Sequence, residues 1–356
     1  MNALARGLLR VVESIVYGPV YGTLAGMIRN PKPIDPEPTW KYLTRKLNPI
    51  HNWVAFNYPP KFMRKLLIKA KMKQDHVLGI AEHYDVSNEF YELFLDKEYM
   101  FYTCADYHDW SESLETAQIR KANRFIELIQ PHAGEKILEL GPGWGPMLNR
   151  IYEETGDKEN LYGYTLSKEQ MDYNAQHGQF NMEFRNFITT DYPANYFDKV
   201  YSVESFEHVR PEDYPTLAKK LFHTLKPGGI GVHQVSLRMN ETVPTTATSV
   251  QLFFPGSLAA SYGHMFRTFE AAGFKFRTQD ILDYRPTLRA WFDRIVANKE
   301  KVWELVGVET YNRYLLMCAV SWRWLNLGWG QTVRVVMQKP HVHSRNKVEE
   351  PELVHA

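Results

Sequence analysis

The chain of 356 residues contains only two cysteines, Cys104 and Cys318. Two cysteines provide neither a disulfide framework nor a cluster of metal ligands, so we expect no metal site and a reducing, cytosolic compartment. A secretory leader with a cleavage site is also lacking at the N-terminus. No recognisable nucleic-acid-binding module accompanies the lysines and arginines, so nucleic acid is not expected as a partner.

An uninterrupted hydrophobic run is lacking as well. The apolar segment Ala3–Ile28 contains Arg6, Arg10, Glu13 and Pro19. A transmembrane helix needs about 20 consecutive apolar residues, so this segment is predicted to lie in the interfacial region of a bilayer instead. The chain is 44% hydrophobic, a content that suits a packed globular protein rather than a disordered chain.

The net charge of +1 hides a strong asymmetry. Residues 1–80 contain thirteen Lys and Arg against four Asp and Glu, which gives +9 for this part and therefore −8 for the rest. A basic region suggests an anionic partner, and we favour a membrane surface. Residues 31–38 carry four prolines and are predicted to form an extended linker. Lys61–Lys73 places six cations among apolar side chains, and a helix packed on the core with a solvated basic face remains the alternative for it.

The segment Lys136–Gly145 is typical of a hydrophobic strand that runs into a glycine turn. A strand, a glycine turn and the helical stretch Met147–Glu154 form the first unit of a doubly wound α/β sheet. Glycines in such a turn let the backbone approach a bound nucleoside, although a tight turn alone would also use them. We therefore predict a cofactor site at Gly141, Gly143 and Gly145.

The next segments favour a cofactor other than NAD. The second predicted strand, Leu161–Tyr164, ends in Thr165, where a nicotinamide-binding fold would place an acid. Ser167 and Gln170 fit a helix capping box, and Gln170 also fits a ribose ligand. Asp191 is predicted to lie at the end of the third strand near an adenine, with an exposed loop aspartate as the alternative.

Ionisable residues follow the fourth predicted strand, Phe197–Val203. They are Glu204, Glu207 and His208. Ligands of open α/β sheets bind beyond the carboxyl ends of strands, and on a helix these three side chains would share one face. The pattern indicates a reaction site, with a charged helix cap as the alternative. His233, on the following strand, would by itself be taken for a core histidine.

In their order and spacing, these segments resemble the cyclopropane-fatty-acyl-phospholipid synthases, a family that includes the mycolic acid cyclopropane synthases. The resemblance covers residues 75–338 and rests on HYDVSNEFY, YTCADY, LETAQ, LELGPGWG, TLSKEQ, SVESFEHV, LKPGG, FFPG and DYRPTLRAW. It implies a class I methyltransferase fold, a doubly wound α/β fold whose seven-stranded, mostly parallel sheet ends in an antiparallel strand, Thr332–Gln338. The expected parts are a basic, helical N-terminal region (1–80), a catalytic domain (81–338) and a polar tail (339–356).

The resemblance also implies S-adenosylmethionine as cofactor and bicarbonate as catalytic base. Carried over by position, the family's cofactor contacts fall on Tyr102, Thr103, Gly141, Gly143, Thr165, Gln170 and Asp191. The family's bicarbonate ligands fall on Cys104, Glu207, His233 and Tyr284. One departure matters for the substrate: Glu204 stands where some members have a small residue. Another segment, Asn240–Gly263, is long enough to act as a lid, or it is a packed loop.

The implied reaction is transfer of a methyl or methylene group from S-adenosylmethionine to the cis double bond of an unsaturated fatty acyl chain. Attack by the alkene would leave a carbocation that aromatic faces can stabilise, and the base would remove a proton so that a cyclopropane ring closes. The aromatic candidates are Tyr107, Phe206, Phe253, Phe254, Tyr262 and Tyr284.

Three other functions stay open at this point. They are fatty acyl C-methylation without ring closure, N-methylation of a small amine, and non-catalytic lipid binding. We expect an unsaturated phospholipid or fatty acyl chain and an anionic membrane surface as partners. A homodimer remains an open option. The expected location is the cytoplasm, with peripheral membrane association.

Overall fold

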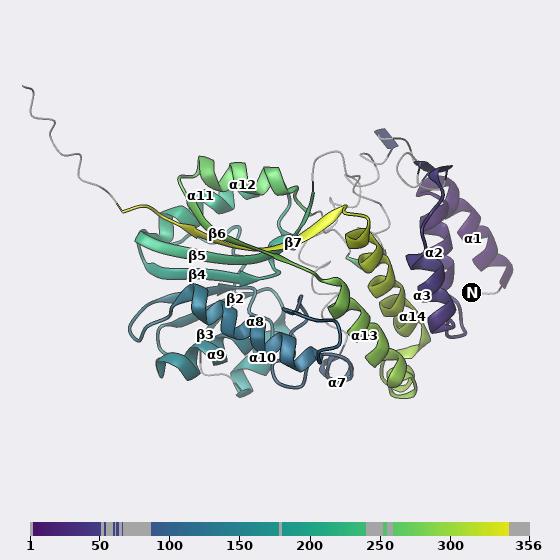
Figure 1. Ribbon diagram of the computed structural model, residues 1–356, viewed down its shortest axis with the longest axis horizontal. Helices are drawn as coiled ribbons and strands as arrows, with labels where there is room; N and C mark the ends of the chain where they lie inside the picture. Colours follow the sequence, from purple (N-terminus) through teal and green to yellow (C-terminus); the bar gives the residue numbers. More distant parts are fainter. Residues whose placement is uncertain are drawn as a thin grey trace, which may run out of the picture.

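The structure is a computed structural model that describes residues 3–50, 53–54, 60, 62–63, 66, 87–177, 180–239, 252–254 and 259–341. Seven strands form one sheet in the order β3-β2-β1-β4-β5-β7-β6 (Figure 1). Their bounds are β1 Ile137–Leu140, β2 Leu161–Thr165, β3 Asn181–Phe184, β4 Phe197–Val203, β5 Leu225–Arg238, β6 Lys275–Leu282 and β7 Gly330–Gln338. Neighbouring strands are parallel except at β7, which runs antiparallel to both β5 and β6. The predicted seven-stranded, mostly parallel sheet is confirmed.

Helices cover both faces of this sheet. They are α8 (Leu114–Ile129), α9 (Pro146–Thr155), α10 (Lys168–His177), α11 (Tyr214–Thr224) and α12 (Tyr262–Ala271). Side chains of α8 and α9 share one buried cluster with Ile137 of β1, whereas α11 and α12 share another with Leu138. Because successive residues of a strand point to opposite faces, β1 is hydrophobic at nearly every position rather than alternating.

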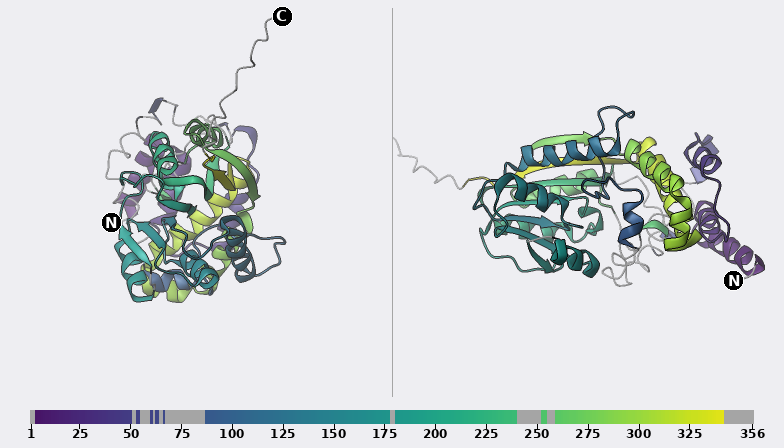
Figure 2. Two further views of the ribbon diagram at one scale, coloured as in Figure 1. Left: turned by 90° about the vertical axis from the view of Figure 1, so that its left-hand side faces the viewer. Right: turned by 90° about the horizontal axis from the view of Figure 1, so that it is seen from below.

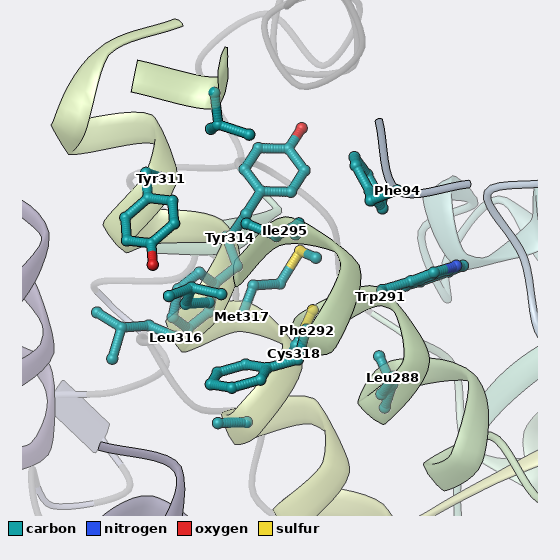
Figure 3. Close-up of a cluster of buried hydrophobic side chains, with 14 of the residues drawn as sticks. Phe94, Leu288, Trp291, Phe292, Ile295, Tyr311, Tyr314, Leu316, Met317 and Cys318 are labelled. Atoms are coloured by element: carbon teal, nitrogen blue, oxygen red, sulfur yellow. The ribbon is translucent and has the colours of Figure 1, made fainter. Parts of the chain in front are cut away.

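A second helical part adjoins the sheet. It contains α1 (Ala3–Val16), α2 (Pro19–Ile28), α3 (Pro36–Thr44), α7 (Asn88–Glu92), α13 (Arg285–Ala297) and α14 (Lys299–Asn326). Figures 1 and 2 show α13 and α14 between the sheet and α1–α3. Trp291 of α13 and Tyr314 of α14 belong to the buried aromatic cluster of this part, together with Phe94 (Figure 3).

Polar contacts hold the N-terminal helices in place. The Asn312 side chain of α14 donates to the carbonyls of Met27, Asn30 and Lys32 and accepts from the Ile34 N–H at 2.9 Å. One buried side-chain amide therefore satisfies the backbone of the segment between α2 and α3. Among the described residues, no helix combines the length and the apolar character needed to cross a membrane.

Some sequence predictions are corrected by these bounds. The third strand ends at Phe184, seven residues before Asp191, because a short loop and turn separate them. Lys226–Gly229, in the LKPGG segment, lies inside β5 where its pairing with β4 is irregular. The proline linker is shorter than predicted, because Pro36 begins α3, where the missing N–H has no helical partner to lose.

Several predictions concern residues outside the described part of the chain. They are most of the basic Lys61–Lys73 segment, the start of HYDVSNEFY, most of the Asn240–Gly263 lid segment, and the tail from residue 342 onward.

Candidate active site

A cavity of about 980 Å³, part of it open to solvent, lies at the carboxyl ends of β1, β2 and β4. The strand order reverses between β1 and β4, and ligands of doubly wound sheets bind at such a point. The lining of the cavity includes six of the eight residues predicted to bind cofactor: Tyr102, Thr103, Gly141, Gly143, Thr165 and Gln170.

The glycine turn shapes one wall of this cavity. Gly141 and Gly143 have φ angles of 75° and 58°, a left-handed conformation that favours glycine. A Cβ at Gly141 would lie 2.8 Å from the Cβ of Ser205, so glycine lets the ends of β1 and β4 approach. No atom lies within 4 Å of the place where a Cβ at Gly143 would point. Glycine at position 143 therefore leaves open space beside the cavity.

The other two predicted cofactor residues do not line the cavity. Gly145 packs instead, because a Cβ there would lie 2.2 Å from Oδ1 of Asn174. Asp191 is fully exposed, with Oδ1 3.6 Å from Nζ of Lys220. This position fits the exposed loop aspartate better than an adenine ligand. At this edge of the sheet the lining comes from Asn186, Phe187 and Ile188, which follow β3 at once and were missed because the strand end was placed too late.

The capping and binding interpretations of Gln170 are compatible. The backbone N–H of Gln170 donates to Oγ of Ser167 at 3.2 Å, which caps α10. The Gln170 side chain accepts from Oγ1 of Thr165 at 3.3 Å and faces the cavity. Capping fixes the start of α10, and the amide remains in the cavity wall.

Glu204 occupies a position that the sequence pattern did not predict. Its φ of 55° places it in the left-handed region directly after β4, and only Phe206–His208 form a short 3-10 helix. The helical spacing that would align Glu204 with Glu207 and His208 therefore does not apply. Glu204 and His208 line the cavity, whereas Glu207 does not.

The Glu204 carboxylate is held by several donors. Its Oε1 accepts from the Cys104 backbone N–H at 2.8 Å and from Nε2 of Gln234 at 2.7 Å. The Tyr284 hydroxyl lies close enough to Glu204 for each group to shift the pKa of the other. The structure thus brings Cys104 and Tyr284, both predicted anion ligands, together around one carboxylate of the chain itself.

The other two predicted anion ligands have different surroundings. Glu207 is buried and accepts from the Ser236 backbone N–H. His233 lies with Nδ1 2.8 Å from Oγ of Ser202 and stacks on Phe206 at a centroid distance of 4.5 Å. Burial lowers the pKa of His233 to about 3, so its imidazole is neutral. These contacts fit the core-histidine alternative.

Burial and mutual repulsion set the charges of the two glutamates. Burial raises the pKa of the Glu204 carboxyl, while hydrogen bonds from Gln234 and Cys104, together with Tyr284 and the nearby Lys121 charge, oppose that rise. Burial raises the pKa of Glu207 well above its usual range, and the Glu204 charge adds to the effect. Two close carboxyls with unequal support divide their roles in this way. The pKa of Glu207 is raised further than that of Glu204, so Glu207 is the one of the two carboxyls that holds a proton more strongly.

Two buried ionisable residues at the site were missed from the sequence. Nζ of Lys121 donates to Oγ1 of Thr103 at 2.6 Å, and burial lowers its pKa to about 8. Glu139, in β1, accepts from the Tyr201 hydroxyl at 2.7 Å, and burial raises its pKa to about 8. Signals for both were available, because Glu139 interrupts a hydrophobic strand and Lys121 falls on the apolar face of α8, seven residues after Leu114.

Behind the site, a buried arginine orients Gln234. Arg334 of β7 has a fully buried side chain, pairs with Asp106 through two contacts of 2.9 and 2.6 Å, and donates to Oε1 of Gln234 at 2.7 Å. Because the Arg334 guanidinium donates to Oε1 of Gln234, the other end of that amide, Nε2, points toward Glu204 and the Cys104 carbonyl. Arg334 on β7 thus orients Gln234 on β5, and Gln234 in turn holds the Glu204 carboxyl.

Two of the proposed aromatic residues lie in packed layers. Phe206 stacks on His233, and Tyr262 stacks on Phe266 and donates to Gln279. The aromatic residues that line the cavity are Phe101, Tyr102, Trp144, Tyr164 and Phe187.

Comparison with known proteins identifies the family. The family model for mycolic acid cyclopropane synthetase matches residues 71–335. The chain is 30% identical over 263 residues to hydroxymycolate synthase MmaA4 of Mycobacterium tuberculosis, covering 66% of this chain and 84% of that protein. It is 29% identical over 262 residues to cyclopropane-fatty-acyl-phospholipid synthase of Escherichia coli, covering 70% and 65% respectively.

The fold also matches a solved structure of this family. Mycolic acid cyclopropane synthase CmaA1, complexed with S-adenosylhomocysteine and CTAB, superposes with a TM-score of 0.67 at 25% identity, over 74% of this chain and 99% of that one. The glycine turn and the polar residues around the cavity described above fit a cofactor of this type. The chain therefore belongs to the mycolic acid cyclopropane synthetase family and is an S-adenosylmethionine-dependent methyltransferase.

Proposed function

We propose that this enzyme transfers a one-carbon unit from S-adenosylmethionine to the cis double bond of an unsaturated fatty acyl chain. The observation that carries the proposal is the pairing of a glycine-walled cavity with a buried carboxyl on its lining, Glu204, which is held by the Cys104 N–H and by Gln234. The names of the two relatives, one a mycolate enzyme and one a fatty-acyl-phospholipid enzyme, support a lipid acceptor.

The residues around the cavity have separate tasks in this proposal. Tyr102, Thr103, Gly141, Gly143, Thr165 and Gln170 would hold S-adenosylmethionine, which supplies an electrophilic methyl group when bound. Aromatic side chains of the lining would exclude water and face the developing positive charge. A base close to the transferred carbon would then accept a proton. Glu204 is the carboxyl on the lining that fits this task.

The function is tested by mass spectrometry of lipids. Purified protein is incubated with S-adenosylmethionine and vesicles of a monounsaturated phosphatidylglycerol. We expect acyl chains heavier by about 14 mass units, one CH₂ group, and resistance of the product to hydrogenation if a ring has closed. A product that still takes up hydrogen would mean methylation without ring closure. No mass gain, despite S-adenosylmethionine binding in calorimetry, would contradict the lipid acceptor.

A second candidate is N-methylation of a small amine. The observation that favours it is the presence of both Glu204 and His208 on the cavity lining, because a carboxylate can pair with an ammonium group and an imidazole can accept its proton. Incubation with small primary and secondary amines in place of lipid separates the two candidates. An N-methylated product without any lipid product would select the amine.

We further propose that α1 docks the enzyme on an anionic membrane. Its outer face carries an apolar stripe of side chains that are 48 to 83% exposed: Leu4, Leu8, Val11, Val12 and Ile15. The spacing places them along one side of the helix. The positive charge of residues 1–80 complements anionic headgroups, each Lys or Arg contributing about 1 kcal/mol near the surface.

The change Leu8→Glu should weaken binding to vesicles that contain anionic lipid by about tenfold, because a charge replaces an apolar side chain that enters the bilayer on docking. Flotation of vesicles with and without phosphatidylglycerol measures the effect. Ile281→Glu is the matched control, since Ile281 is 69% exposed and lies on β6 of the sheet rather than on α1. Equal loss in both variants, or a change in oligomer mass without a change in flotation, would contradict docking by α1.

A further inference from the structure

The donors expected to bind a catalytic bicarbonate already bind a carboxylate of the chain. The Cys104 N–H donates to Oε1 of Glu204 at 2.8 Å, and the Tyr284 hydroxyl lies close enough to act on the same carboxyl. Cys104 and Tyr284 are two of the four positions that the family resemblance assigns to bicarbonate. The residues present therefore do not fit a free bicarbonate ion, because its place among these donors is filled.

Several independent features fix Glu204 in this place. A non-glycine residue with a φ of 55° has a strained backbone, so surrounding contacts must hold it there. Gln234 supplies one of those contacts and is itself held by Arg334 and by the Cys104 carbonyl. The left-handed turn directs the side chain back toward these donors at the end of β4.

A second anion beside Glu204 would also be repelled. Like charges repel more strongly in a buried site than in water, because the effective dielectric constant there is lower. Glu207 and Asp106 would add to this repulsion when ionised, because both lie close enough to act on their neighbours at the site. Lys121 offsets part of the Glu204 charge.

We propose that the Glu204 carboxylate takes the place of bicarbonate as the base of the reaction, so that the enzyme works without bicarbonate. This inference rests on the proposed lipid function. The alkene electron pair forms a bond to the methyl carbon, and the sulfur–carbon bond breaks with its electrons going to sulfur. The Glu204 carboxylate then takes one proton from the transferred carbon, and the released C–H electron pair closes the ring. The carboxylic acid loses this proton to solvent before the next turnover.

Two substitutions of the same residue test the proposal. Glu204→Gly removes the carboxylate and opens its site, and glycine suits the left-handed backbone, so this variant should fold. Glu204→Gln keeps the shape and fills the site without a charge. Rates are measured in carbon-dioxide-free buffer, with and without added bicarbonate.

Wild-type turnover should be the same within about twofold with or without bicarbonate. Glu204→Gly should be slower by about 10²–10⁴-fold without it, the usual contribution of a general base. Added bicarbonate or formate should restore a large part of that loss. Glu204→Gln should be slow under both conditions, because the amide blocks the opened site. A wild-type enzyme that loses its activity in carbon-dioxide-free buffer would overturn the proposal.

A binding measurement tests the role of Glu204 independently of the proposed lipid acceptor. Binding of ¹³C-labelled bicarbonate is followed by NMR in the presence of S-adenosylhomocysteine, without any lipid. We expect binding to Glu204→Gly and none to the wild type or to Glu204→Gln. Stoichiometric binding by the wild type, or no binding by Glu204→Gly, would overturn the assignment of this site. Failure of lipid methylation with this binding pattern intact would instead count against the lipid function alone.

Discussion

Replacing Arg334 with methionine is expected to lower the free energy of unfolding by about 3–5 kcal/mol. The guanidinium is fully buried, pairs with Asp106 and donates to Gln234. Methionine has a similar volume but no charge, so the change leaves a buried carboxylate without compensation and a buried amide oxygen without its donor. Urea denaturation followed by circular dichroism measures the loss.

Arg124→Met is the matched control for this change. Arg124 pairs with Asp280 on the same side of the sheet, but its side chain is 35% exposed, and pairs of this kind contribute about 0–1 kcal/mol. The double variant Asp106→Asn with Arg334→Met should be more stable than Arg334→Met alone, because no unpaired charge remains. A loss of under about 1 kcal/mol in Arg334→Met would contradict a structural role for the buried pair.

Gly143→Val is expected to weaken S-adenosylmethionine binding by at least about 100-fold, or about 2.7 kcal/mol. The position has a φ of 58°, lines the cavity and has open space where a side chain would project. Valine would fill the space that the cofactor needs and would also strain the turn. Isothermal titration calorimetry with S-adenosylmethionine measures the affinity without any acceptor.

Gly156→Val separates the two effects of this change. Gly156 has a φ of 67°, has no atom within 4 Å of its Cβ position, and ends α9, the helix that follows the glycine turn. It does not line the cavity. A left-handed valine costs about 1–2 kcal/mol or more of stability at either position, but only Gly143→Val should lose cofactor affinity. Equal affinities in both variants would place the cofactor elsewhere.

The sheet could be predicted from the sequence because its signals are local. Phe197–Val203 and Leu161–Tyr164 are short hydrophobic runs bounded by turns, and the observed strands match them to within one residue. The glycine turn is also predictable from local sequence, since a left-handed backbone favours glycine at fixed positions. The helix that follows it, α9, was also predicted to within one residue at each end.

The chemistry of the site depends on partners that are distant in the sequence. Glu204 meets Cys104 across 100 residues, and Arg334 meets Asp106 across 228. No spacing rule connects such residues. The sequence pattern therefore predicted that Glu204 shares a helix face with Glu207 and His208, although Glu204 lies before the short helix. Asp191 was misplaced for a different reason, since an exposed four-residue strand such as β3 carries a weak hydrophobic signal.

Both native thiols are inaccessible, which has a practical consequence. Cys104 and Cys318 are completely buried, and burial raises the pKa of each thiol, so neither offers the reactive thiolate to a labelling reagent. A cysteine introduced on the outer side of α1 would then carry a fluorophore or spin label alone. The natural chain is thereby a ready background for spectroscopy of how deeply this helix enters a bilayer.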